Sequence, residues 1–143
     1  MATKIFVNLP VKDLVKTKAF FAHLGYTFNP QFTNDDAACM VISEDIYAML
    51  LTEPFFKGFI QKEIVDAKKA TEVLVCLSAE SRQAVDTMVS KAVEAGGKAL
   101  PNKQEHGDYM YGWGYEDLDG HHWEVMWMDM SKTPADLAAQ ANS

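Results

Sequence analysis

The spacing of apolar residues in the first third of the chain predicts a strand followed by a helix. Residues 4–11 alternate apolar and other side chains, as in a strand that is buried on one face. In residues 13–25 the apolar positions recur at helical spacing, and Asp13 and Gly25 suit the two ends of that helix. Three further runs, rich in β-branched or aromatic residues, predict three strands. They are YTFNPQF, AACMVIS and YAMLLT.

The same order of elements recurs in the second half of the chain. TEVLVCLS predicts a strand, and the following AESRQAVDTMVSKAVEAGG carries an apolar helical stripe that ends at Gly96 and Gly97. Three more strands are predicted at GKALPN, DYMYGWGYE and HHWEVMWM. Two tandem βαβββ modules predict an α+β protein in which two curved sheets face each other around a central cleft.

We expect residues 1–143 to form one domain made of two repeats, at about 1–54 and 70–130. A chain of this length can bury a sizeable core. The connecting segment, residues 55–69, is rich in aromatic residues and is neither cleanly helical nor stranded. We expect it to pack its aromatic side chains on a sheet.

A single carboxylate interrupts the last predicted strand. Because strand side chains alternate between faces, His122, Glu124 and Met126 share one face, and Trp123 and Trp127 share the other. Glu124 therefore faces either water or a cavity. Water is the common environment of a glutamate, whereas a cavity would make Glu124 a binding or catalytic group.

The turn before this strand decides which residues lie beside Glu124. An even number of turn residues would pair Tyr115 with Glu124 and bring Tyr111 and Trp113 onto the same face. An odd number would bring the two glycines of that strand there instead. The sequence leaves both registers open, and the first makes Tyr111, Trp113 and Tyr115 candidate ligand-binding residues.

Charge and composition exclude several classes of partner. The formal net charge is −7 and the pI is about 5.0, which disfavours nucleic acid and anionic membrane surfaces and favours a neutral or cationic small molecule. No apolar run approaches the roughly 18 residues of a membrane span. No signal peptide is recognisable, and Cys39 and Cys76 are isolated, so we expect a cytoplasmic protein with reduced thiols.

Two motifs resemble the vicinal oxygen chelate superfamily of glyoxalase, bleomycin-resistance and extradiol dioxygenase proteins. VNLPVKDLVKTKAFFAHLGY resembles the family's opening strand and helix, which end in LG(F/Y), and EDLDGHHWEV resembles its DPDGH…E hairpin. Together with the doubled βαβββ order, the resemblance covers nearly the whole chain. It implies a site in the cleft, within a superfamily that holds lyases, dioxygenases, transferases and plain binding proteins.

In metal-dependent relatives, the ligands come from the first strand and a late strand of each half. By motif, these positions fall on Phe6, Leu50, Glu72 and Glu124. Histidine is usual where Phe6 and Glu72 stand, so the ligand set is degenerate and we expect no cofactor. If a metal binds, Glu72 and Glu124 suit Mg²⁺ or Mn²⁺ better than Zn²⁺, Ni²⁺ or Fe²⁺.

The resemblance also implies which other residues belong to the site. Glu72 and Glu124 are the candidate catalytic or anchoring carboxylates, and His106 lies in a loop where relatives often contact substrate. His121 is expected to stabilise the turn, as in relatives. The expected ligand-binding residues that line the cleft are Phe6, Asn8, Leu50, His106, Tyr111, Trp113, Tyr115 and Met126.

Two functions from different classes fit these residues. The first is a protein of the bleomycin-resistance type that holds a neutral or cationic small molecule in an apolar cleft, with carboxylate anchors. The second is a divalent-metal-dependent lyase or isomerase of the glyoxalase type, or a dioxygenase, in which a carboxylate moves a proton. Whether the protein is an enzyme stays open. The resemblance and the apolar residues of the last strand also predict a homodimer.

Overall fold

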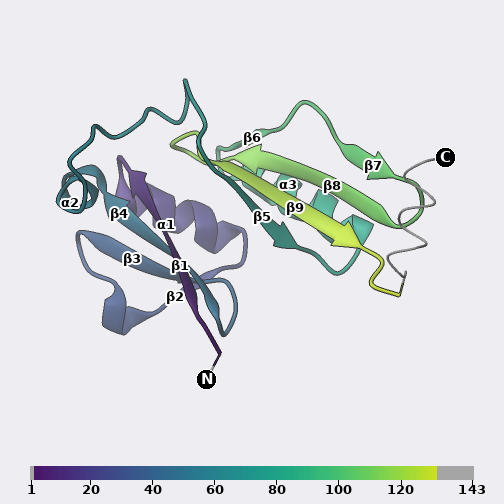
Figure 1. Ribbon diagram of the computed structural model, residues 1–143, viewed down its shortest axis with the longest axis horizontal. Coiled ribbons are helices and arrows are strands. Elements are labelled where there is room, and N and C mark those ends of the chain that lie inside the picture. The colour runs from purple at the N-terminus through teal and green to yellow at the C-terminus, as the bar shows by residue number, and fades with distance from the viewer. Residues whose placement is uncertain (1, 132–143) are drawn as a thin grey trace. The chain divides into compact units, whose positions relative to one another are not determined.

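The computed structural model describes residues 2–131. The chain divides into two compact units, Met1–Ala70 and Thr71–Ser143. The first unit contains a βαβββ series, and the second contains the same series with one extra strand, β7. Figure 1 colours the first unit from purple through teal and the second from teal to yellow. The prediction of an α+β fold with two multi-stranded sheets is confirmed.

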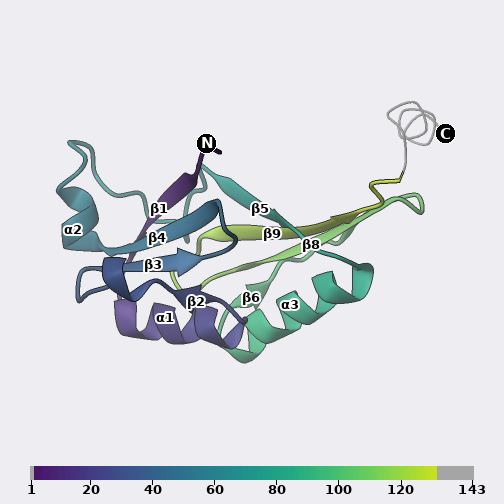
Figure 2. The ribbon, with the colours of Figure 1, turned by 90° about the horizontal axis from the view of Figure 1, so that it is seen from below.

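The first unit is a four-stranded sheet covered on one face by a helix. Its elements are β1 (Ile5–Val11), α1 (Leu14–His23), β2 (Thr27–Phe28), β3 (Ala37–Val41) and β4 (Ile46–Thr52). The strand order is β1-β4-β3-β2, with β1 parallel to β4 and the other pairs antiparallel. Figure 2 shows α1 running beneath this sheet. The apolar face of the sheet and the apolar stripe of α1 together bury the core of the unit.

The caps of α1 agree with the sequence. The Asp13 side chain accepts a hydrogen bond from the backbone N–H of Lys16 at 3.0 Å, which satisfies one of the free donors of the first turn. Gly25 follows the C-cap with φ of 106°, a conformation that favours glycine. The buried side chains between these ends include Leu14, Phe20 and Phe21.

The second unit repeats this plan in a five-stranded sheet. Its elements are β5 (Leu74–Ser78), α3 (Arg82–Glu94), β6 (Lys98–Ala99), β7 (Gln104–His106), β8 (Met110–Glu116) and β9 (His122–Met128). The order is β5-β9-β8-β6, β7 also pairs with β8, and β5 is parallel to β9. Helix α3 packs on one face of β8 and β9. The other face of this sheet is the one that α3 does not cover.

Three short elements were not predicted. The helix α2 (Glu53–Lys57) begins at the end of the first repeat and continues into the connecting segment, and Pro54 suits its first turn. The 3-10 helix η1 (Pro30–Phe32) starts at Asn29, whose side chain accepts from the backbone N–H of Gln31 at 2.9 Å. Strand β7 is the third. None of the helices in the described residues is long and apolar enough to cross a membrane.

Candidate functional site

The turn between β8 and β9 is built around the buried carboxylate of Asp117. Its Oδ1 accepts hydrogen bonds from the backbone N–H groups of Asp119 and His121, both at 3.0 Å. Its Oδ2 accepts from the indole Nε1–H of Trp123 at 2.9 Å. Burial raises the pKa of Asp117, and the charge of His121 and these hydrogen bonds offset part of that rise. The carboxylate therefore organises the whole turn.

The length of this turn fixes the register of the β8–β9 hairpin. Glu116 and His122 form the closing pair, so residues 117–121, an odd number, make up the turn. Gly114 consequently lies opposite Glu124. Residues that are directly opposite in an antiparallel pair share a face. Of the two registers that the sequence left open, the one with the glycines on the Glu124 face is therefore correct.

The three aromatic residues of β8 lie on the other face, so the prediction that they share the Glu124 face is wrong. The Tyr111 hydroxyl donates to Oδ1 of Asp86 on α3. Burial and this hydrogen bond raise the pKa of Tyr111 to about 12. Tyr115 is buried and stacks on Trp123, with ring centroids 6.4 Å apart. Tyr111 and Tyr115 thus build the core against α3 instead of binding a ligand.

Glu124 has two polar neighbours on its own face of the sheet. Its Oε2 lies 3.0 Å from Nε2 of His122, and these two side chains are 23% and 21% exposed. Cys76 of β5 is directly opposite Glu124 in the parallel register. Burial raises the pKa of the Cys76 thiol, and the negative charge of Glu124 raises it further. Glu124 and His122, which are half buried, and Cys76, which is exposed, therefore form one polar cluster that solvent reaches.

A small pocket adjoins this cluster. Its volume is about 20 Å³, room for about one water molecule, whereas ligand pockets usually hold roughly 300 Å³ or more. The Trp113 side chain reaches the rim, where its Nε1–H donates to the carbonyl oxygen of Leu100 at 2.8 Å. The pocket is lined by Leu100, Asn102, Gln104, Gly112, Trp113, Glu124 and Met126. Glu124, Met126 and Trp113 thus meet at one place, although Trp113 comes from the other face.

The structure does not bring Glu72 next to Glu124. Strand β5 begins at Leu74, and Glu72 is exposed in the segment before it. The residue paired with Glu124 is Cys76, four positions later, which corresponds to roughly 13 Å along a strand. The expected pairing of two carboxylates is corrected, because the motif placed Glu72 in a strand that starts further along the chain.

Leu50 also lies on a different face from the one expected. In the parallel register of β1 and β4 it pairs with Leu9, and both side chains are buried in the core of the first unit. Asn8, on the other face, pairs with Met49. Met49 is therefore the late-strand residue that shares a face with Asn8 and Phe6, and the prediction for Leu50 was displaced by one residue, which reverses the face.

Phe6 and Asn8 lie on the solvent-accessible face of the first sheet, as expected for residues that could contact a ligand. Phe6 is half exposed, and its ring stacks on Tyr47 with centroids 4.9 Å apart and planes 10° apart. The Asn8 amide donates to the carbonyl oxygen of Phe6 at 3.2 Å. This face of the first unit offers aromatic and amide surface without a carboxylate on these strands.

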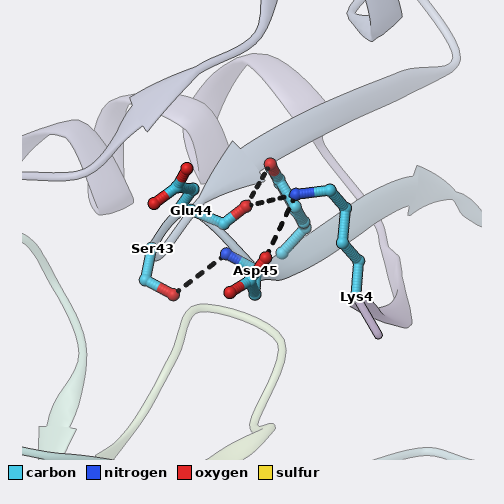
Figure 3. A network of polar contacts seen from close by, with 5 residues as sticks. Lys4, Ser43, Glu44 and Asp45 are labelled. Carbon is cyan, nitrogen blue, oxygen red and sulfur yellow. Dashed lines mark hydrogen bonds and ion pairs between the residues drawn. The ribbon is translucent and has the colours of Figure 1, made fainter. Parts of the chain in front are cut away.

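A polar network around Lys4 lies next to the start of β1. Figure 3 shows its ammonium group between the carbonyl oxygen of Glu44, at 2.7 Å, and Oδ1 of Asp45, at 3.2 Å. The backbone N–H of Asp45 also points to Oγ of Ser43, at 3.4 Å. The hydrogen bond to Asp45 raises the pKa of Lys4. These groups are exposed and satisfy one another, so they stabilise the β3–β4 turn.

The remaining histidines have different placements. His106 ends β7, is exposed, and pairs with Met110 on the same face as the glycines of β8. A ligand contact by His106 stays a prediction. His121 takes part in the Asp117 turn through its backbone N–H, as expected for a turn residue.

The donor set does not fit the metal centre that the resemblance implied. Within residues 2–131, no group of three or more His, Cys, Asp or Glu side chains is placed to hold a metal ion. Glu124 has His122 and Cys76 as neighbours, and Glu72 lies away from them. No step that depends on a metal is therefore derived below.

The sequence places Cys76 on the same face as Glu124, which the register confirms, but sequence reasoning missed Met49 and the direct pairing of Cys76 with Glu124. The helix N-caps Asp13 and Ser81 lie 68 positions apart (81 − 13). Applied to the preceding strands, the same offset matches Asn8 with Cys76. The cross-strand partners of these two residues are Met49 and Glu124. Alignment of the two halves by their caps would have shown that Cys76 and Asn8 hold equivalent positions in the two sheets.

Comparison with known proteins agrees with this architecture. The family model for the bleomycin resistance protein-like N-terminal region matches residues 3–43. No curated protein is significantly similar to the chain in sequence. A hypothetical protein from S. aureus is 28% identical, with a TM-score of 0.73 over 89% of this chain and 95% of that one.

Two other solved structures share the fold at lower identity. A glyoxalase-related enzyme from Fulvimarina pelagi is 17% identical, with a TM-score of 0.75 over 95% of each chain. The fosfomycin resistance protein FosX from Listeria monocytogenes is 15% identical, with a TM-score of 0.65 over 93% of this chain and 96% of that one. The shared fold and the N-terminal family match both agree with the resemblance to the vicinal oxygen chelate superfamily.

Proposed function

From the fold and the N-terminal match to this superfamily, we propose that the protein is a small-molecule binding protein of the bleomycin-resistance type. Its ligand is a neutral or cationic organic molecule, bound in the cytoplasm on the Glu124 face of the second unit. The observation that carries the proposal is Glu124 itself, a half-buried carboxylate on a sheet face that also carries His122, Cys76 and Met126. Such a carboxylate beside the apolar side chain of Met126 orients a ligand and selects its charge.

The charge of the whole protein supports this choice of ligand. A formal net charge of −7 attracts cations and repels anions over the surface. His122 supports Glu124 as the anchor, since a histidine nitrogen at 3.0 Å fixes one carboxylate oxygen and leaves the other for a ligand. Removal of the charged partner of a hydrogen bond costs about 1.5–3 kcal/mol, which sets the effect expected from a single substitution.

The test compares three ligands that share a phenyl ring, are similar in size and differ in charge. Benzylammonium, benzyl alcohol and benzoate are titrated into the wild-type protein by calorimetry at pH 7. The proposal predicts binding of the first two but not of benzoate, and a loss of about 1.5–3 kcal/mol for the cation in E124Q. E72Q is the matched control, because Glu72 is exposed outside the strand and its substitution should leave the affinity unchanged. Equal affinity for benzoate, or an unchanged cation affinity in E124Q, contradicts the proposal.

A second candidate is a lyase or isomerase of the glyoxalase type. The close approach of His122 Nε2 to Glu124 Oε2 favours it, because a histidine held by a carboxylate is suited to moving a proton at a substrate carbon or oxygen. Turnover of a 2-oxoaldehyde hemithioacetal that is lost in both H122Q and E124Q would favour this function. Binding without turnover favours the first.

We also propose a homodimer. Exposed apolar side chains support it, above all Phe59, which is 71% exposed and packs edge-on against Phe55 at 5.3 Å. Light scattering should give about 32 kDa, twice the chain mass of 16.0 kDa. A mass of one chain at micromolar concentration contradicts this part of the proposal.

A further inference from the structure

The two glycines of β8 that lie on the Glu124 face differ in what a side chain would meet there. A Cβ on Gly114 would lie 2.3 Å from the carbonyl oxygen of Trp123 and 2.7 Å from Cδ1 of Leu100. Real Cβ atoms essentially never lie closer than 3.0 Å to a non-bonded heavy atom, and a backbone oxygen in a paired strand cannot move far enough to restore that distance. Gly114 is therefore required by the close approach of β9, and the Leu100 side chain already covers it.

Gly112 is not required by the fold. A Cβ there would have its nearest backbone neighbour, the carbonyl oxygen of Val125, at 3.6 Å, an ordinary contact. Its φ is also negative, unlike that of Gly107 in the preceding turn. The tight contact is with Cε of Met126, at 3.1 Å, which is the tip of a flexible side chain. Neither packing of the backbone nor its conformation demands glycine at this position.

The Met126 side chain therefore occupies the space above Gly112. Methionine is unbranched with three rotatable side-chain bonds, so it can leave such a position at small cost. The pocket beside it is only about 20 Å³ with Met126 in place. Displacement of Met126 would add the space above Gly112 to that pocket and would expose a floor of bare backbone beside Glu124.

We propose that Met126 closes a slot above Gly112, and that this slot admits a flat ring that carries a planar cation. A glycine floor has no side chain to obstruct a flat group, and Trp113 and Leu100 line the same pocket. Glu124 supplies the negative charge, and a planar amidinium group can donate a charge-assisted hydrogen bond to the carboxylate oxygen that His122 leaves for a ligand. The inference rests on the proposed function. It adds the shape of the ligand and the role of Met126 as the side chain that must move before the ligand binds.

The experiment uses benzamidine, with neutral benzamide as the matched control ligand. The protein is labelled with ¹³C at the methionine methyl groups, and both ligands are titrated by NMR. The expected result is a saturable shift of the Met126 methyl signal with benzamidine and little or none with benzamide. The Met49 methyl signal, from the equivalent strand of the first unit, should stay in place.

Three variants separate the slot from the anchor. G112A fills the slot while the protein keeps its fold, and should weaken benzamidine by about tenfold, as steric filling costs about 1–3 kcal/mol. E124Q should weaken it by about tenfold or more. M126A, which leaves the slot open, should bind at least as tightly as the wild type.

The outcomes distinguish the slot from the proposed function. If E124Q weakens benzamidine while G112A binds like the wild type and the Met126 methyl does not shift, the slot is wrong and Glu124 remains the anchor. If benzamidine binds and E124Q has no effect, the proposed function fails. If neither the wild type nor M126A binds benzamidine, the slot is wrong, and the trial with benzylammonium decides the function separately.

Discussion

The sheets of the two units share the order of four strands but differ in the side chains at three equivalent positions on the face opposite the helix. At the positions of His122 and Glu124 the first unit has Tyr47 and Met49, and at the position of Cys76 it has Asn8. The shared features are the helix caps and the apolar face beneath each helix. The fold therefore depends on what the units share, and the proposed chemistry depends on what they do not.

The largest expected effect comes from substitution of a glycine in β8, the strand that pairs with Glu124 through Gly114. G114A would force a Cβ against the Trp123 carbonyl oxygen at 2.3 Å, so it should lower the free energy of unfolding by about 3 kcal/mol. G112A, with only the Met126 tip to displace, should change it by less than about 1 kcal/mol. Urea unfolding measures both. Equal losses in the two variants would contradict the assigned register.

The turns of the two units should differ next. D117A leaves three N–H donors of the second-unit turn without their acceptor and should cost about 2 kcal/mol. D45A in the first-unit turn removes an exposed pair with Lys4, which solvent screens, and should leave the free energy of unfolding nearly unchanged. Chemical unfolding at pH 7 checks both. A costly D45A or a neutral D117A would show that the turns are organised differently.

Asp117 should also make stability depend on pH. Burial raises its folded-state pKa above the unfolded value of 3.8, so the folded state holds the proton more tightly. The contribution of this group to stability is complete below pH 3.8 and is lost as the pH rises through the folded pKa. D117N should remove this decline, and unfolding free energies measured across that range should show the difference. If the unfolding free energy of D117N depends on pH in the same way as that of the wild type, a group other than Asp117 causes the dependence.

The helix caps should behave alike in both units. D13A and S81A each remove a side-chain acceptor for a backbone N–H at the start of a helix, at 3.0 Å in both cases. Each should cost about 1 kcal/mol in thermal or chemical unfolding. D13N and S81T, which keep an acceptor, should recover most of it. A large difference between the two Ala variants would break the equivalence of the repeats.

The sequence predicted the fold because the apolar periodicity, the caps and the repeat all specify the same elements. It did not predict the neighbours of Glu124, because these depend on register. A turn of five residues instead of four moves every side chain of β8 to the other face. The apolar periodicity of the strands does not reveal that Asp117 organises this turn. Glu72 and Leu50 were misplaced for the same reason, since motif spacing does not give the start or phase of a strand.

The most direct test of the account is the reactivity of Cys76. If Cys76 lies opposite Glu124, burial and that negative charge both raise the pKa of its thiol. E124Q removes the second cause, so the pH midpoint for iodoacetamide labelling of Cys76 should move downward. E72Q should leave it in place, and the buried Cys39 serves as the internal control, followed by peptide mass spectrometry. Identical profiles for the wild type and E124Q would separate Cys76 from Glu124 and contradict the site, whereas a shift in E124Q alone is the result that the structure predicts.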